Sequence, residues 1–133
     1  MTIIFLGACA SCCAQGIGPE DKVISIFFGG GSYWMDEEQS LRLSDFIFDV
    51  ERLNEYDIEV HGHTNDIGSV EYNQYLSEMR SRTVISYLMT LDMDFHDIKK
   101  IDFGELNPVY DNDSWSGRLN NRRVDVVLRK LML

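Results

Sequence analysis

The side chains best suited to ligand binding are the arginines, and most of them lie late in the chain. Residues 1–79 contain 3 basic and 14 acidic side chains, whereas residues 80–133 contain 9 basic and 8 acidic ones. The late arginines are Arg80, Arg82, Arg118, Arg122, Arg123 and Arg129. A planar guanidinium can bind a carboxylate or a phosphate through two parallel hydrogen bonds, although pairing with the surplus acids is the simpler interpretation. The pattern allows a local anion site within an acidic protein.

Other chemistry-bearing groups favour structural interpretations. His61 and His63 are two apart on an expected strand and share a face, as in His-x-His metal sites, but no third ligand has useful spacing. Three consecutive acids at 36–38 are expected to begin a helix, because its dipole favours negative charge there. The glycines at 29–31 lack the Lys-Ser/Thr pair of a phosphate-binding loop. We therefore expect no metal, no cofactor, no catalytic residues and no enzymatic reaction.

Length and charge limit the classes of partner. With 133 residues the chain fits one domain, and 12 Lys and Arg against 22 Asp and Glu give a formal net charge of −10. Such a charge argues against nucleic acid and against an anionic lipid surface as partners. At 44% hydrophobic residues the chain can form a packed core, and it has no apolar run of the roughly 20 residues that span a bilayer.

The first residues are typical of an export signal. Residues 1–18 carry no charge, and residues 2–14 are apolar or small throughout. We interpret residues 1–14 as a signal peptide with a truncated start, because no Lys or Arg precedes the apolar run, and residues 15–22 as a short linker. Alternatively, Leu6-Gly7-Ala8-Cys9 is a lipobox, and a lipid on Cys9 would be the one membrane attachment. All three cysteines lie in this segment, so no disulfide framework is expected downstream.

The rest of the chain alternates between strand and helix patterns. Strands are predicted at 22–28, 57–63, 98–103 and 123–128. Helices are predicted at 36–53 and from an N-cap at Ser69 to about residue 90, the second with an apolar face of Tyr72, Leu76, Met79, Val84, Tyr87 and Leu88. Residues 104–121 are predicted to form a long surface loop. This order indicates an α/β (α+β) sandwich in which helices pack on one sheet.

Three separated blocks form the most specific pattern in the sequence. Residues 62–84 read GHTNDIGSVEYNQYLSEMRSRTV, residues 104–108 read GELNP, and residues 117–124 read GRLNNRRV. Together they resemble the OmpA-like peptidoglycan-binding domain, whose pattern is roughly G-x-T-D-x-x-G-x-x-x-x-N-x-x-L-S-x-x-R-A-x-x-V, then G-x-G-E-x-x-P, then G-R-x-x-N-R-R-V. The resemblance covers residues 23–128, and the order of the blocks makes it strong.

The resemblance implies a fold and a ligand. It implies an OmpA-C-like two-layer sandwich over residues 23–133, with a mixed four-stranded sheet in β-α-β-α-β-β order. In the family, an Asp after the Thr binds the ammonium of diaminopimelate in the peptidoglycan stem peptide, and a helix Arg binds its carboxylate. These positions are Asn65 and Arg80 here. The remaining ligand-binding residues implied are Thr64, Asp66, Gly68, Asn73, Leu76 and Arg123.

The departure from the family pattern lies at Asn65, where the family has Asp. An amide oxygen accepts a hydrogen bond from an ammonium without the charge that roughly doubles its strength, and Asp66 could supply that charge if the loop shifts. The resemblance implies non-covalent peptidoglycan binding that anchors an envelope component, in the periplasm or at the outer membrane. Other envelope proteins are further possible partners. The alternative is an OmpA-like protein-interaction module whose wall binding is weakened or lost because of Asn65.

Overall fold

A computed structural model describes residues 17–93, 98–104 and 113–132. The expected signal segment at 1–14, the candidate lipid site at Cys9 and the second motif block beyond Gly104 lie outside these ranges. Of the expected linker at 15–22, the described part leads directly into the first strand, which begins at Lys22.

Four strands form one mixed sheet in the order β1-β4-β2-β3. They are β1 (Lys22–Phe27), β2 (Tyr56–His63), β3 (Ile98–Gly104) and β4 (Arg123–Lys130). The central strand β4 runs antiparallel to both β1 and β2, whereas β2 and β3 are parallel. The register is fixed by alternation, because Val124, Val126 and Leu128 enter the core while the residues between them face the other side.

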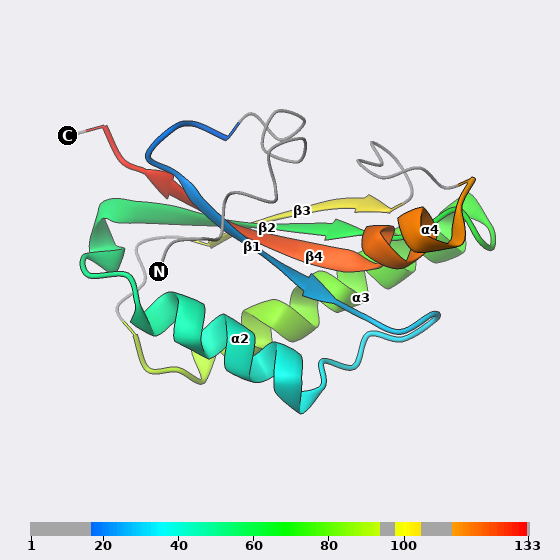
Figure 1. Ribbon diagram of the computed structural model, residues 1–133, viewed down its shortest axis with the longest axis horizontal. Helices are drawn as coiled ribbons and strands as arrows, with labels where there is room; N and C mark the ends of the chain where they lie inside the picture. Colours follow the sequence, from blue (N-terminus) through cyan, green and yellow to red (C-terminus); the bar gives the residue numbers. More distant parts are fainter. Residues whose placement is uncertain (1–16, 94–97, 105–112, 133) are drawn as a thin grey trace.

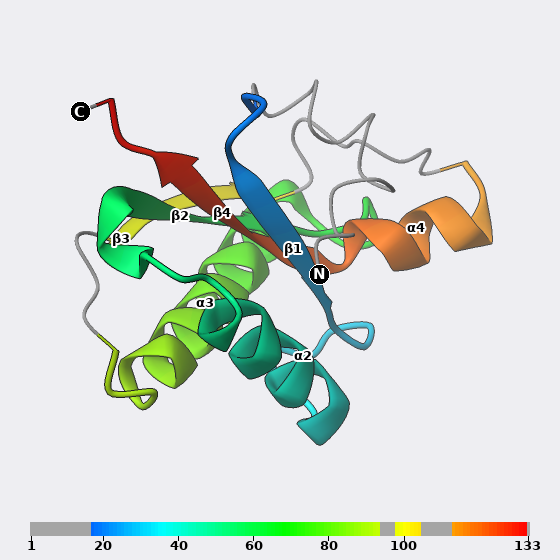
Figure 2. The same ribbon diagram turned by 60° about the vertical axis from the view of Figure 1, so that its left-hand side comes forward.

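Two helices cover one face of the sheet. Helix α2 (Glu37–Phe48) lies against β1, and helix α3 (Val70–Met89) lies against β2 and β3, as Figures 1 and 2 show from two directions. The buried core between sheet and helices is built from Ile24, Ile26, Phe28, Met35, Leu43, Phe46, Ile47, Leu53, Tyr56, Ile58, Val60, Val84, Leu88, Val124, Val126 and Leu128. This arrangement confirms the expected sandwich.

Local capping explains where the helices begin. The Asp36 carboxylate accepts from the Gln39 amide at 2.9 Å, and Glu37 and Glu38 occupy the first turn of α2, as expected. The Ser69 hydroxyl accepts from the Tyr72 amide at 3.1 Å and caps α3, which confirms the predicted start. A short 3-10 turn, η2 (Leu53–Glu55), precedes β2.

Two expectations about the helices are corrected. Helix α2 ends at Phe48 instead of residue 53. Leu53 still packs into the core, but from the separate turn η2. The expected loop at 104–121 contains a helix, α4 (Trp115–Asn121), whose N-cap Ser114 accepts from the Gly117 amide at 3.0 Å. Within the described residues, no helix is long and apolar enough to cross a membrane.

The contact face of α3 also differs from the apolar face that was predicted. Leu76, Val84 and Leu88 are buried, but Tyr72 is 45% exposed. Four polar residues lie on the buried face instead: Asn73, Ser77, Arg80 and Ser81. The helix approaches β2 so closely at Gly62 that a Cβ there would overlap the Ser77 carbonyl oxygen and the Ser81 hydroxyl. Small polar side chains therefore replace large apolar ones where helix and sheet meet most tightly.

Candidate functional site

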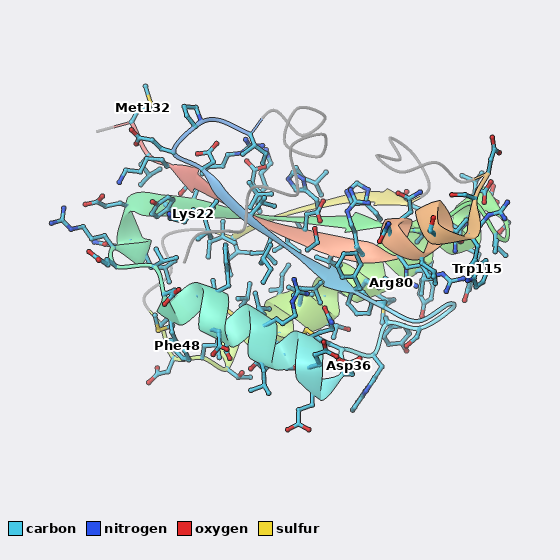
Figure 3. All side chains as sticks on the ribbon, in the orientation of Figure 1. Lys22, Asp36, Phe48, Arg80, Trp115 and Met132 are labelled. Carbon is cyan, nitrogen blue, oxygen red and sulfur yellow. The ribbon has the colours of Figure 1, made fainter. Side chains whose placement is uncertain are left out.

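The predicted site residues gather at one end of the sheet. Strands β1, β2 and β3 end there and β4 begins there, since Phe27 pairs with Arg123 and His63 pairs with Gly104. The turn after β1, the loop after β2 and helix α4 meet at this end, which lies at the right in Figure 1. Figure 3 labels Arg80 and Trp115 in this region.

Arg80 is fixed in place by the backbone. Its guanidinium nitrogens donate to the carbonyls of Ser32 (Nε, 2.7 Å), His63 (Nη1, 3.1 Å) and Gly29 (Nη2, 3.0 Å). The group also lies 5.3 Å from the centre of the Phe28 ring and is 1% exposed. Burial and the neighbouring Arg122 cation lower the pKa of Arg80 to about 10, so the side chain remains a cation at neutral pH. Three of its five N–H groups are thereby used within the fold.

The turn after β1 is held against α3 and α4. Besides its two bonds from Arg80, its Tyr33 carbonyl accepts from the Thr83 hydroxyl at 2.9 Å. The Phe28 amide donates to the Arg122 carbonyl at 2.8 Å, and a Cβ on Gly30 would lie 3.1 Å from the Arg122 guanidinium carbon. Glycine is favoured at residue 30 because the Arg122 side chain occupies the space of a larger residue, and at residue 31 because its φ is +67°.

The loop after β2 carries four of the predicted residues, of which Thr64, Asn65 and Gly68 shape its backbone. Thr64 is buried, its amide donates to the Gly104 carbonyl at 2.7 Å, and its hydroxyl has no hydrogen-bond partner. The Asn65 side chain is 7% exposed, and its Oδ1 accepts from the Ile67 amide at 3.0 Å. Gly68 has a φ of +100°, a conformation that favours glycine. Asn65 therefore closes a local turn, and Gly68 allows the chain to enter α3.

Asp66 differs from Asn65 in both charge and exposure. It is exposed, and its Oδ1 accepts from Arg118 Nε of helix α4 at 3.1 Å. The two side chains are 41% and 32% exposed, respectively. This ion pair joins the loop after β2 to α4.

Asn73 and Leu76 lie on the buried face of α3, at 1% and 4% exposure. A Cβ on Gly68 would lie 3.7 Å from the Asn73 Oδ1, which places this amide behind the loop. Both residues thus form the inner wall of the site.

Arg123 lies on the opposite side of the sheet from the helices. It is fully buried, and its Nε donates to both carboxylate oxygens of Asp125 at 3.0 Å. The same carboxylate accepts from the Ser25 hydroxyl at 2.6 Å, and His63 Nε2 lies 3.8 Å from it. Burial, with the nearby Arg123 and His61, lowers the pKa of His63 to about 2 because Arg123 already compensates Asp125. The expected structural roles of the two histidines agree with this geometry, in which His61 bonds Glu59 at 2.9 Å.

Arg122 was not among the predicted site residues, yet it faces Arg80. Its guanidinium lies 5.1 Å from the centre of the Trp115 ring, and its buried Nε has no hydrogen-bond partner. No ion pair joins it to a carboxylate of the described residues. The sequence carries no separate signal for it, because Arg122 is the C-cap of α4, a helix that was predicted as a loop. Arg80 and Arg122 thus both lie against the turn after β1, and neither pairs with a carboxylate in the part of the chain that the structure describes, an arrangement that favours an anion.

Metal binding has no structural support in this region. In residues 17–93, 98–104 and 113–132, no group of three His, Cys, Asp or Glu side chains is arranged to hold an ion.

Residues 27–122 match the OmpA family. The chain belongs to this family. The matched range extends from the end of β1 to Arg122 and includes the turn after β1, the loop after β2, and helices α3 and α4. It confirms the resemblance inferred from the three sequence blocks.

Two relatives match about half of this OmpA-family chain. Outer membrane protein A of Bordetella avium is 40% identical over 65 residues, which cover 49% of this chain and 34% of that protein. The peptidoglycan-binding protein ArfA of Mycobacterium tuberculosis is 32% identical over 71 residues, which cover 53% of this chain and 22% of that protein. The matched part of the chain therefore spans 34% of the length of the first relative and 22% of the second.

The structural comparison supports the fold. The peptidoglycan-associated lipoprotein of Burkholderia pseudomallei matches with a TM-score of 0.71 and 24% identity, covering 79% of this chain and 89% of that chain. At this identity the likeness establishes the shared sandwich and leaves the ligand to be argued from the site itself.

Proposed function

We propose that this OmpA-family chain binds peptidoglycan non-covalently and anchors an envelope component to the cell wall. The observation that carries the proposal is the pair of arginines, Arg80 and Arg122, which both lie against the turn after β1 and pair with no carboxylate of the described residues. Family membership, and relatives named as a peptidoglycan-binding protein and a peptidoglycan-associated lipoprotein, support it. The role is one of binding, as in the OmpA family, and no reaction is part of it.

The ligand we propose is the stem peptide, through its diaminopimelate residue. The free end of diaminopimelate carries an ammonium and a carboxylate on one carbon, so it needs an anion or acceptor beside a cation. Arg80 supplies a fixed positive charge, and Arg122 presents its guanidinium to the carboxylate. In this proposal Asn65 and Asp66 of the loop after β2 are the acceptors for the ammonium.

The other predicted residues shape this site in the proposal. The Thr64 hydroxyl, which is buried without a partner, offers a hydrogen bond to the ligand. Gly68 allows the turn, and Asn73 and Leu76 support the loop from behind. Arg123 fixes the start of β4 through Asp125 and thereby positions its neighbour Arg122.

The place of action follows from the ligand. Peptidoglycan lies outside the cytoplasmic membrane, so we propose a periplasmic or outer-membrane location, in line with relatives named as outer membrane proteins. Other envelope proteins, and a lipid on Cys9, belong to the same proposal.

One observation favours a second candidate, a protein-interaction module without wall binding. Asn65 carries no charge, and its oxygen is already bonded to the Ile67 amide. If no other group replaces the charge of the family's Asp, the ammonium has no strong partner.

Retention on purified sacculi separates the two candidates. The full chain is incubated with sacculi, and bound protein is measured in the pellet. We expect Arg122→Gln to lower affinity about tenfold, the effect of one charge-assisted hydrogen bond. Arg82→Gln is the matched control, because it also removes one arginine charge. Arg82 lies on the exposed face of α3, where it pairs with Glu78.

Equal retention of wild type and Arg122→Gln would refute the proposed site. Absence of retention in wild type would favour the interaction module. Release of soluble muropeptides during the incubation would show hydrolysis and overturn the assignment as a binding protein.

A further inference from the structure

Helix α4 carries a tryptophan ring that the fold holds in place but does not bury. The Trp115 side chain is 61% exposed, although an indole is among the groups that gain most from burial. The Arg122 guanidinium lies over the ring, with its carbon 5.1 Å from the ring centre. This contact between a cation and an aromatic face orients the ring and leaves much of its surface to solvent.

Tyr72 of α3 provides a second exposed ring, at 45% exposure. Its hydroxyl oxygen would lie 3.7 Å from a Cβ on Gly31, and its Cδ2 would lie 3.4 Å from a Cβ on Gly68. The ring therefore reaches from the loop after β2 to the turn after β1. Both glycines have a positive φ, which disfavours any residue with a side chain that would cover the ring.

The turn after β1 brings the two rings to one place. The Arg122 guanidinium carbon would lie 3.1 Å from a Cβ on Gly30, and Tyr72 lies against the next residue, Gly31. Consecutive Cα atoms are only about 3.8 Å apart, so Arg122 and Tyr72 border the same short piece of backbone. Since Trp115 lies against Arg122, the order of groups is ring, backbone, guanidinium, ring.

This mixture of groups suits a sugar. One face of a pyranose ring presents C–H groups with partial positive charge, which pack on the negative face of an aromatic ring. A guanidinium has five N–H donors, so Arg122 can bond a sugar hydroxyl as well as a carboxylate. A purely apolar partner would cover the guanidinium without offering it an acceptor, which is costly.

The ligand of the proposed function brings a sugar within reach of these rings. A stem peptide is attached through its first residue to a sugar of the glycan strand. Three extended residues, from alanine to diaminopimelate, span at most about 11 Å. The Trp115 ring centre is 5.1 Å from the guanidinium that we propose to bind the diaminopimelate carboxylate, that of Arg122. The attached sugar can therefore contact the ring while the peptide stays in its site.

We propose that Trp115 and Tyr72 form a carbohydrate subsite that packs on a sugar ring of the glycan strand. The inference rests on the proposed function and adds a second class of ligand, a neutral carbohydrate, to the stem peptide. Contact with both parts of the wall makes the chain distinguish a stem peptide on its glycan from a stem peptide that has been cut free.

The test compares two soluble probes by calorimetric titration of the full chain. One is the tripeptide of alanine, glutamate and diaminopimelate, acetylated on its alanine amine. The other is the same tripeptide joined through that amine to the wall disaccharide, so the two probes carry the same charge. We expect wild type to bind the disaccharide probe about tenfold more tightly, and Trp115→Ala to bind both alike.

Phe48→Ala is the matched control. Its side chain is 58% exposed, and Figure 3 shows it at the opposite end of the molecule from Trp115, so this variant should keep the wild-type ratio of affinities. A shift of Arg122 in Trp115→Ala acts on both probes, and their ratio therefore reports on the sugar.

Further variants separate the rings from their polar groups. Trp115→Phe should retain part of the wild-type ratio, because a smaller ring still packs on the sugar. Tyr72→Leu should lower the ratio, whereas Tyr72→Phe should keep it, since the ring and not the hydroxyl contacts the sugar. A wild-type ratio in Tyr72→Leu would remove Tyr72 from the subsite.

The outcomes distinguish the inference from the proposed function. If wild type binds both probes alike, or if Trp115→Ala keeps the wild-type ratio, the inference is wrong and stem-peptide binding stands. If wild type binds neither probe nor sacculi, both fail. If only the disaccharide probe binds, and Trp115→Ala abolishes that binding, the carbohydrate subsite stands and the assignment to the stem peptide is wrong.

Discussion

Arg80 connects three segments that are far apart in the sequence. Its bonds to the carbonyls of Gly29, Ser32 and His63 hold the turn after β1 to the end of β2. Replacing Arg80 would therefore be costly to the fold, because three carbonyls would lose their partner. For this reason Arg122, which donates no such bonds, is the cleaner residue for testing the ligand.

The position of Arg80 was readable from the motif, but its surroundings were not. Spacing along a helix gives the face on which an arginine lies, whereas its partners come from a turn about fifty residues away. The motif likewise marked the arginines at 122 and 123 together. Only the strand geometry separates Arg123, which is paired with Asp125, from Arg122, which faces Arg80.

Asn65→Asp should strengthen binding to diaminopimelate-containing wall by about tenfold. The new carboxylate can still accept from the Ile67 amide and close the turn, while it adds charge beside Asp66. The measurement is a binding isotherm on sacculi. Unchanged affinity would mean that residue 65 does not lie at the ammonium.

Ser81→Ala should raise the free energy of unfolding by about 1 kcal/mol, because the buried Ser81 hydroxyl has no hydrogen-bond partner. Ser77→Ala is the matched control on the same helix face. The Ser77 hydroxyl donates to the Gln74 carbonyl and accepts from the Gly104 amide at 3.1 Å, so its loss should cost about 1–2 kcal/mol. Urea unfolding measures both, and destabilisation by Ser81→Ala would contradict the assignment.

At the scale of elements, local signals predicted most of the fold. Capping residues and acidic first turns gave the starts of α2 and α3, and alternation gave the strands. Helix α4 escaped prediction because seven residues containing a glycine and two asparagines have little intrinsic tendency to form a helix. In the structure, α4 also makes contacts with distant parts of the chain, such as the ion pair between Arg118 and Asp66.

The close approach of α3 to β2 depends on Gly62. Gly62→Ala should destabilise the domain by about 3 kcal/mol, because the new Cβ would overlap the Ser77 carbonyl and the Ser81 hydroxyl, so the helix must shift. Gly29→Ala is the control, since its Cβ would meet nothing closer than the Ser32 Cβ at 3.9 Å. Equal melting temperatures for both variants would show that the helix does not pack as described.

For the whole molecule, the buried His63 makes stability depend on pH. Burial, Arg123 and His61 hold its pKa at about 2 in the folded protein, against 6.5 for an ordinary histidine. Below pH 6.5 the unfolded chain binds a proton that the folded chain excludes. The contribution of His63 is therefore present above pH 6.5 and is lost as the pH falls toward 2, by about 1.4 kcal/mol per unit.

This pH dependence is testable by comparing two slopes. Unfolding free energies of wild type and His63→Gln are measured by urea denaturation between pH 7 and pH 4.5. The variant should show a flatter slope, whatever its absolute stability, because the carboxylates titrate in both proteins. Parallel slopes would mean that His63 is accessible to protons in the folded state.

The charge distribution of the whole chain limits the kind of ligand that suits it. The net charge of −10 makes the chain a poor partner for nucleic acid, yet its late arginines include Arg80 and Arg122, two cations that lie against the turn after β1. We propose that a ligand carrying both signs of charge suits such a protein.

The most direct test of wall binding is competition on sacculi. The full chain is bound to purified diaminopimelate-containing sacculi, and the soluble tripeptide of alanine, glutamate and diaminopimelate is added in increasing amounts. The account predicts saturable binding that the tripeptide displaces completely. Retention that the tripeptide leaves unchanged, or no retention at all, would contradict the account.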